Sequence, residues 1–169
     1  MECTVHRRRA MPKRADGARP GVIRVLVAGG EALMRASVSA VLGTGNGMAV
    51  VGEATTDDEA IALARETRPD VILIDGADGL HVLSTTQRLL ADPDLVGTQV
   101  LMLGRFEREE DVLAALRSGI AGLIDRDAPP YELVRTVLLA AGGDMFVMPS
   151  NLRRLAGRLQ IRDIDSHEE

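Results

Sequence analysis

The sequence contains few cysteine, histidine and aromatic residues. Among its 169 residues are one cysteine, three histidines, one tyrosine, two phenylalanines and no tryptophan. The single Cys3 excludes an internal disulfide framework and a cysteine-rich zinc site, and the scattered histidines have no metal-ligand spacing. So few aromatic rings argue against a nucleic-acid reader that stacks bases on aromatic side chains.

Long apolar segments are also absent. No apolar run reaches the roughly 18 residues that a membrane-spanning helix needs, and the N-terminus lacks the apolar segment of a secretory signal. We therefore expect a cytoplasmic protein that does not enter a membrane. With 46% hydrophobic and 27% charged residues, the composition is that of an ordinary globular domain with one buried core.

Charge is unevenly distributed along the chain. The net charge is −5, but residues 1–20 hold six basic and two acidic residues, so the remainder is strongly acidic. A basic tail on an acidic domain can contact nucleic acid or a membrane surface. The simpler interpretation, which we favour, is a disordered basic leader over residues 1–20.

Apolar runs alternate with helical periodicity between residues 21 and 143. Strands are predicted at 22–27, 48–51, 70–75, 99–103 and 121–124. Helices are predicted at 34–42, 56–67, 82–90, 112–118 and 130–141. Five strands that are apolar on both faces favour a parallel sheet with helices on each side, a doubly wound α/β domain. Ligands of such sheets bind beyond the carboxyl ends of the strands.

Residues 144–169 follow the last predicted strand–helix unit. Leu152, Leu155, Ala156 and Leu159 recur at helical spacing, so we expect a linker, a short amphipathic helix and a polar tail. A helix of about twelve residues is marginal alone and needs a surface to dock on. The domain that we predict is therefore residues 21–143.

Five segments, taken in order and at their spacing, carry a family resemblance. They are Ile23–Ala28 (IRVLVA), Val50–Ala54 (VVGEA), Ala64–Asp75 (ARETRPDVILID), Ala115–Gly122 (ALRSGIAG) and Asp127–Leu133 (DAPPYEL). Over about residues 22–155 the sequence resembles the receiver domain of bacterial two-component response regulators, NarL/LuxR-type branch. The resemblance implies a flavodoxin-like (βα)5 fold and a role in phosphorelay signal transduction and transcription regulation.

The resemblance also assigns roles to positions at the carboxyl ends of the strands. Such a receiver accepts a phosphoryl group from a histidine kinase on an aspartate that ends the third strand, here Asp75. The family holds Mg²⁺ with an acidic pair after the first strand, because carboxylates bind this hard cation. That pair corresponds to Gly29 and Gly30. The family's strand-four hydroxyl residue, strand-five aromatic residue and lysine correspond to Gly104, Leu123 and Arg126.

These departures favour an atypical receiver with a degenerate phosphorylation pocket. We expect Asp75 to be a structural residue and no metal or other cofactor to be bound; the side chain of Glu31, next to the two glycines, should point elsewhere. The space that the glycines leave could accept an anionic small molecule near Arg126. The alternative, which we favour, is that Arg126 pairs with Asp75.

The function that we expect is protein–protein interaction and homodimerisation, with residues 131–141 and 151–161 offering apolar surface. A histidine kinase or another regulatory protein is a candidate partner. The helix-turn-helix through which this family reads DNA is not among the 169 residues, so DNA would be contacted only through a domain outside this chain. Whether the chain is a stand-alone receiver or a fragment stays open.

Two alternatives remain. In the first, the chain is a conventional receiver that is phosphorylated on Asp75 with Mg²⁺. In the second, it is a small-molecule or nucleotide-binding enzyme on the same fold, because a fold does not fix a function. The sequence disfavours the enzyme, since Gly29-Gly30 lacks the G-x-G-x-x-G and Walker spacings that cradle phosphates.

Overall fold

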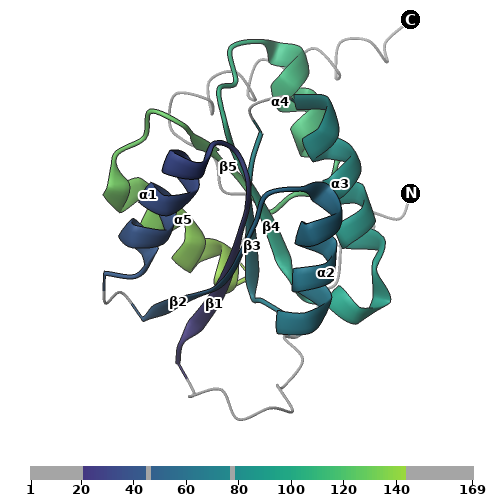
Figure 1. Cartoon of the computed structure of the whole chain (residues 1–169). Coiled ribbons are helices and arrows are strands. Elements are labelled where there is room, and N and C mark those ends of the chain that lie inside the picture. Colours follow the sequence, from purple (N-terminus) through teal and green to yellow (C-terminus); the bar gives the residue numbers. More distant parts are fainter. Residues whose placement is uncertain (1–20, 45–46, 77–78, 144–169) are drawn as a thin grey trace, which may run out of the picture.

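Five parallel strands form one sheet in the order β2-β1-β3-β4-β5. The computed structural model describes residues 21–44, 47–76 and 79–143. Its strands are β1 (Ile23–Gly29), β2 (Met48–Ala54), β3 (Val71–Asp75), β4 (Gln99–Gly104) and β5 (Gly122–Asp125). The strand order reverses at β1, so the carboxyl ends of β1 and β3 flank a topological switch point (Figure 1).

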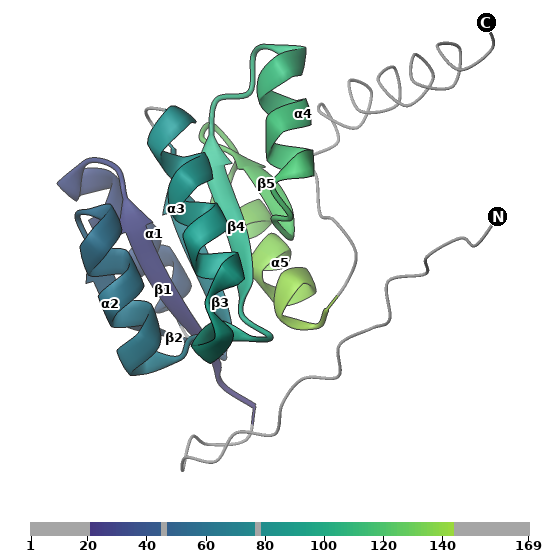
Figure 2. The same cartoon turned by 90° about the vertical axis from the view of Figure 1, so that its right-hand side faces the viewer.

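Helices cover both faces of this sheet. They are α1 (Ala32–Leu42), α2 (Asp57–Thr67), α3 (Gly79–Ala91), α4 (Glu109–Arg117) and α5 (Pro130–Ala141), with a 3-10 turn at Pro93–Leu95. Figure 2 shows α2, α3 and α4 on one face and α1 and α5 on the other. The doubly wound α/β fold with a five-stranded parallel sheet is confirmed.

The ends of α2 show why the sequence forms its helices where it does. The Thr56 hydroxyl caps the helix by accepting from the backbone N–H of Glu59 at 3.2 Å, and the Glu59 carboxylate accepts from the backbone N–H of Thr55 at 2.8 Å. The backbone N–H and the hydroxyl of Thr55, which both donate to this carboxylate, lower the pKa of Glu59. At the other end, Arg68 adopts a left-handed conformation before Pro69, which ends the helix.

Both faces of the sheet are buried, and successive strand residues alternate between two parts of the core. Leu26, Ile72 and Leu123 pack beneath α2, α3 and α4, whereas Val25 and Leu73 pack against α1 and α5. Each of these side chains is almost wholly buried. The burial of each stabilises the fold by about 1.5–3 kcal/mol. This core holds the carboxyl ends of the strands in a fixed arrangement.

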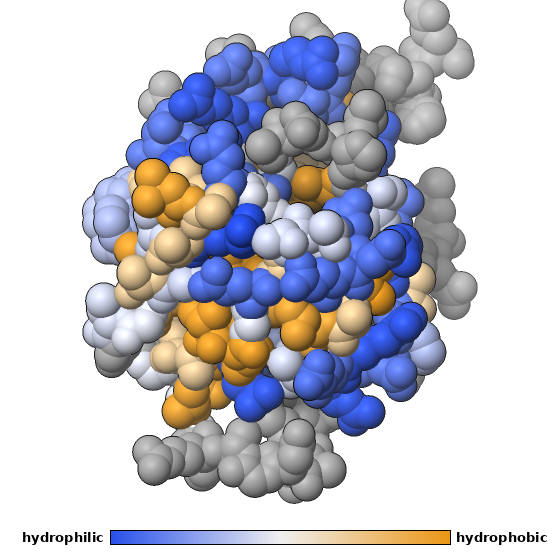
Figure 3. Space-filling view, viewed as in Figure 1, coloured by the Kyte–Doolittle hydropathy of each residue, from blue (hydrophilic) through white to orange (hydrophobic). Residues whose placement is uncertain are grey.

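The outer surface is apolar in one region. Figure 3 shows apolar side chains gathered over α1 and the edge strand β2, while the surface of α4 is hydrophilic. Leu33 on α1 is 78% exposed and Tyr131 on α5 is 71% exposed. Within the described ranges, no helix is both long and apolar enough to cross a membrane.

Two of the segments discussed above lie outside the described residues. They are the predicted leader, 1–20, and the predicted linker, amphipathic helix and tail, 144–169.

Candidate functional site

The strand ends bring five of the six predicted site residues to one edge of the sheet. Asp75 ends β3, in register with Gly29, the last residue of β1, and Gly30 follows. Gly104 ends β4, and its carbonyl accepts from the backbone N–H of Arg126 at 3.0 Å, just beyond β5. Five residues from four distant places in the sequence therefore lie at the edge where ligands of this fold class bind.

Arg126 pairs with Asp75 in the described structure. Its Nη2 donates to Oδ2 of Asp75 at 2.6 Å, and the side chains are 21% and 4% exposed. The pairing that we favoured from the sequence is thus present. Because Nη2 of Arg126 already donates to Asp75, it is not available to bind an anion. The bond joins one atom of each group. Asp75 Oδ1 and Arg126 Nε are buried and have no hydrogen-bond partner among the described residues.

The two glycines are required by their backbone conformation and by the closeness of Asp75. Gly29 has φ +76° and Gly30 has φ +70°, the left-handed region that other residues rarely adopt. A Cβ on Gly29 would lie 2.7 Å from the carbonyl oxygen of Asp75. A Cβ on Gly30 would collide with the Asp75 carboxylate, 2.7 Å from its Cγ. The Asp75 side chain therefore fills the space that a side chain at position 30 would enter.

A second guanidinium lies at the same turn. Arg35 of α1 donates from Nη1 to the carbonyl of Gly30 at 2.6 Å and to that of Gly29 at 3.4 Å. Sequence reasoning missed this contact, although an arginine in the first turn of the helix after Gly-Gly was a usable signal. Glu31 is exposed and precedes α1. The described part of the chain holds no cluster of three or more His, Cys, Asp or Glu residues suited to a metal ion.

Apolar side chains surround Gly104 and the sixth predicted residue, Leu123. A Cβ on Gly104 would lie 3.3 Å from Cζ of Phe106, whose ring packs against the core beneath α2, α3 and α4. Phe106 therefore lies beside the position that the resemblance assigns to a hydroxyl residue. Leu123 is fully buried within that core, two residues before the carboxyl end of β5, and therefore does not join the other five.

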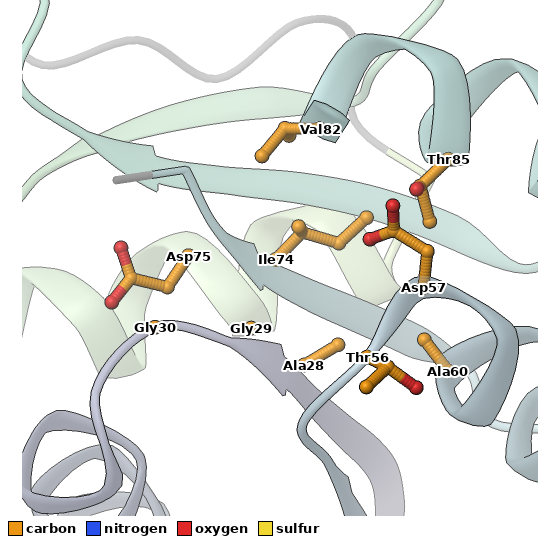
Figure 4. A pocket seen from close by; sticks show the side chains of 10 residues that line it. All are labelled: Ala28, Gly29, Gly30, Thr56, Asp57, Ala60, Ile74, Asp75, Val82 and Thr85. Carbon is orange, nitrogen blue, oxygen red and sulfur yellow. The ribbon is translucent and has the colours of Figure 1, made fainter. Parts of the chain in front are cut away.

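A pocket of about 120 Å³ opens on the α2 and α3 side of the sheet edge. It is lined by Ala28, Gly29, Gly30, Thr56, Asp57, Ala60, Ile74, Asp75, Val82 and Thr85. Figure 4 shows the Asp75 carboxylate turned toward Gly30 and away from Asp57 and Thr85. Asp75 lines this pocket, whereas Arg126, with which it pairs, does not. Sequence reasoning did not identify Asp57 or Thr85 as pocket residues, because both fit an ordinary helix.

Comparison with known proteins places the chain in a family. Residues 25–138 match the family described as the response regulator receiver domain. The chain is 31% identical over 137 residues to the response regulator GacA of Pseudomonas viridiflava. This alignment covers 80% of this chain and 63% of GacA. It is 32% identical over 147 residues to the transcriptional regulatory protein NarL of Mycobacterium tuberculosis, which covers 85% of this chain and 66% of NarL.

The fold agrees with a solved structure. The signal receiver domain of NarL from Mycobacterium tuberculosis superimposes with a TM-score of 0.67 and 30% sequence identity, over 73% of this chain and 99% of that domain. Against the curated relatives named above, the chain spans slightly less than two thirds of their length. The chain belongs to the response regulator receiver domain family, the signalling modules of two-component systems.

Proposed function

We propose that this chain is an atypical receiver, which acts through protein–protein interaction and homodimerisation and does not depend on phosphorylation of an aspartate. We propose further that it is not an enzyme and binds no cofactor. The observation that carries the proposal is the turn after β1, where Gly29 and Gly30 stand beside Asp75 in a conformation that suits glycine.

The residues around Asp75 do not fit Mg²⁺. This ion takes oxygen ligands in a near-octahedral arrangement and neutralises charge during phosphoryl transfer. Gly29 and Gly30 have no side-chain oxygen, Glu31 is exposed, and one oxygen of Asp75 is already bonded to Arg126. A side chain added at position 30 would meet the Asp75 carboxylate. We therefore propose that Asp75 does not act together with a bound metal ion.

The surface of α1 and α5 supports homodimerisation. These helices pack on the same face of the sheet, and they expose Leu33, Tyr131 and Leu138. Helices α1 and α5 are in contact, and exposed apolar side chains on neighbouring elements are typical of a protein–protein interface. The named relatives are a response regulator and a transcriptional regulatory protein, so we propose a role in transcription regulation. DNA contact would then require a further domain, and a histidine kinase or another regulatory protein would be the partner.

One observation favours the conventional alternative, in which Asp75 is phosphorylated. Asp75 ends β3, at the position where the family carries its acceptor, and its Oδ1 has no partner among the described residues. This alternative requires Mg²⁺ and predicts that assembly changes with a phosphodonor.

Light scattering distinguishes the two functions. The whole chain is measured at micromolar concentration in Mg²⁺, with and without acetyl phosphate, beside the Asp75→Asn variant. We expect a dimer mass in all three samples. A mass that increases only with acetyl phosphate, and does not increase in Asp75→Asn, would establish the conventional function. A monomer throughout would contradict the homodimer.

A further inference from the structure

The pocket beside α2 and α3 has an apolar floor and a polar wall. Ala28, Ile74 and Val82 supply aliphatic surface, whereas Asp57 and Thr85 are polar residues of the wall. Figure 4 shows the Asp57 carboxylate and the Thr85 side chain on the same side of the pocket, across from Ile74. No basic side chain is among the ten residues that line it.

Thr85 carries a hydroxyl whose hydrogen-bonding capacity is unused. The residue is 2% exposed, and its Oγ1 has no hydrogen-bond partner within the described residues. A helical threonine commonly donates to the carbonyl four residues earlier, as Thr67 and Thr136 do at 2.7 and 2.8 Å. Thr85 makes no such bond. An unsatisfied buried polar group is costly, and a ligand in the adjacent pocket would satisfy it.

Asp57 differs from its two acidic neighbours in the first turn of α2. Asp58 pairs with Arg88 at 3.2 Å, and Glu59 accepts from Thr55 at 2.8 Å. For Asp57 no hydrogen bond or ion pair is found within the described ranges, and the residue is half-buried at the pocket. A half-buried carboxylate with no cation beside it favours a positively charged group in the pocket.

We propose that this pocket binds a small organic cation, a primary ammonium group on a short aliphatic body. The ammonium would donate to the Asp57 carboxylate and to the Thr85 hydroxyl, and the aliphatic body would lie on Ala28, Ile74 and Val82. The volume is about 120 Å³, and a cavity of about 150 Å³ holds benzene, so the pocket suits a group of about five non-hydrogen atoms. The proposal does not rest on the proposed function, because the polar partners that it names are Asp57 and Thr85 and not Asp75.

Titration of the ¹⁵N-labelled whole chain with butylammonium chloride tests the proposal, with the amide signals observed by NMR and sodium chloride added to match the ionic strength. We expect saturable shifts confined to the amides around residues 28–30, 56–60 and 82–86, with a millimolar Kd, as is reasonable for about five non-hydrogen atoms. Asp57→Asn should weaken binding about tenfold and Thr85→Val about fivefold, since each removes one polar partner. Thr85→Ser should restore it.

Thr86→Val is the matched control. Thr86 is also fully buried with an unpartnered hydroxyl, but it does not line the pocket, so its variant should bind as the unmodified chain does. Absence of saturable shifts, or an unchanged Kd in both Asp57→Asn and Thr85→Val, would overturn the proposal. Equal binding of 1-butanol would reduce the site to an apolar cavity. The same shifts with magnesium chloride alone would make it a divalent-cation site, which also contradicts the proposal.

Discussion

Arg126 donates to Asp75 across 2.6 Å and thereby joins the end of β5 to the end of β3, two strands that β4 separates. Little of either side chain is in contact with solvent, so the charges attract each other more strongly than an exposed pair would. Loss of one partner leaves the other charge buried and uncompensated. We therefore propose a structural role for the pair, at the edge where the family carries out phosphoryl transfer.

The first prediction concerns this pair. Arg126→Ala should destabilise the domain at pH 7 by about 3 kcal/mol, the lower end of the range for breaking a buried pair, because Arg126 keeps some solvent contact. Asp75→Asn in the same background should recover most of that loss. Urea unfolding of the four proteins in this double-mutant cycle gives the coupling energy directly.

Arg105→Ala is the control for that cycle. Arg105 approaches Asp127 at 3.8 Å, and both side chains are mostly exposed, so the variant should change the free energy of unfolding by only about 0–1 kcal/mol. A coupling energy of zero between positions 75 and 126 would show that the two side chains do not interact in solution. The space at the glycine turn would then be open to an anion.

The second prediction concerns Gly30. Gly30→Ala should destabilise the domain more than Gly143→Ala. The two glycines have similar positive φ values, +70° and +77°, so backbone strain is alike, but only a Cβ at position 30 meets another group. Gly143→Ala should cost about 1 kcal/mol from backbone strain alone. The difference between the two variants in urea unfolding therefore measures the collision with Asp75. Equal losses would show that Asp75 moves aside freely.

The third prediction concerns pH. Arg65 donates from Nε to Oδ2 of Asp92 at 2.7 Å, and this bond, with the backbone N–H of Asp94, lowers the pKa of Asp92. The folded state then binds this proton less readily than the unfolded state, so the pair stabilises the fold above the ordinary carboxyl pKa and loses that effect as the pH falls through the lowered pKa. The free energy of unfolding of the unmodified chain should exceed that of Asp92→Asn at pH 7, and this difference should shrink as the pH falls to about 3.

Arg65→Gln removes the same bond from the other partner, and its stability deficit should shrink over the same pH interval. A deficit of constant size in both variants would mean that the pair does not titrate with folding.

The fourth prediction concerns the dimer surface. Leu33→Arg, combined with Tyr131→Glu, should convert the dimer to a monomer in light scattering without changing the circular dichroism of the domain, because charges are placed in an apolar interface. Leu90→Arg is the control, since Leu90 is a partly exposed leucine of α3, on the other face of the sheet. A dimer that persists in the double variant, or that Leu90→Arg disrupts, would assign the interface to another surface.

Much of the fold could be predicted from the sequence because apolar periodicity reports burial directly. The boundaries differ where the pattern is polar. Strand β2 extends beyond residue 51 through Gly52 and Glu53, which a one-sided edge strand tolerates. Helix α4 begins at Glu109, before the first predicted apolar residue, because an acidic first turn favours a helix N-terminus without adding to the apolar stripe.

The site was only partly predictable. The pairing of Asp75 with Arg126 could be predicted because the family resemblance places both residues at the carboxyl ends of strands. The contact of Arg35 with Gly30, and the space that Asp75 takes beside that glycine, depend on how closely two turns approach in the folded chain. Thr85 fits the buried stripe of α3, so its unpartnered hydroxyl becomes visible only when the neighbours of the helix are known.

Intact-mass spectrometry after incubation with acetyl phosphate in millimolar Mg²⁺ is the most direct test of the proposed phosphorylation independence. A conventional receiver in the same reaction confirms that the phosphodonor is active. Because Gly29 and Gly30 supply no carboxylates for the metal and Arg126 holds Asp75, we predict that the mass of this chain does not change. A stoichiometric adduct of about 80 Da, one phosphoryl group, that disappears in Asp75→Asn would contradict the account.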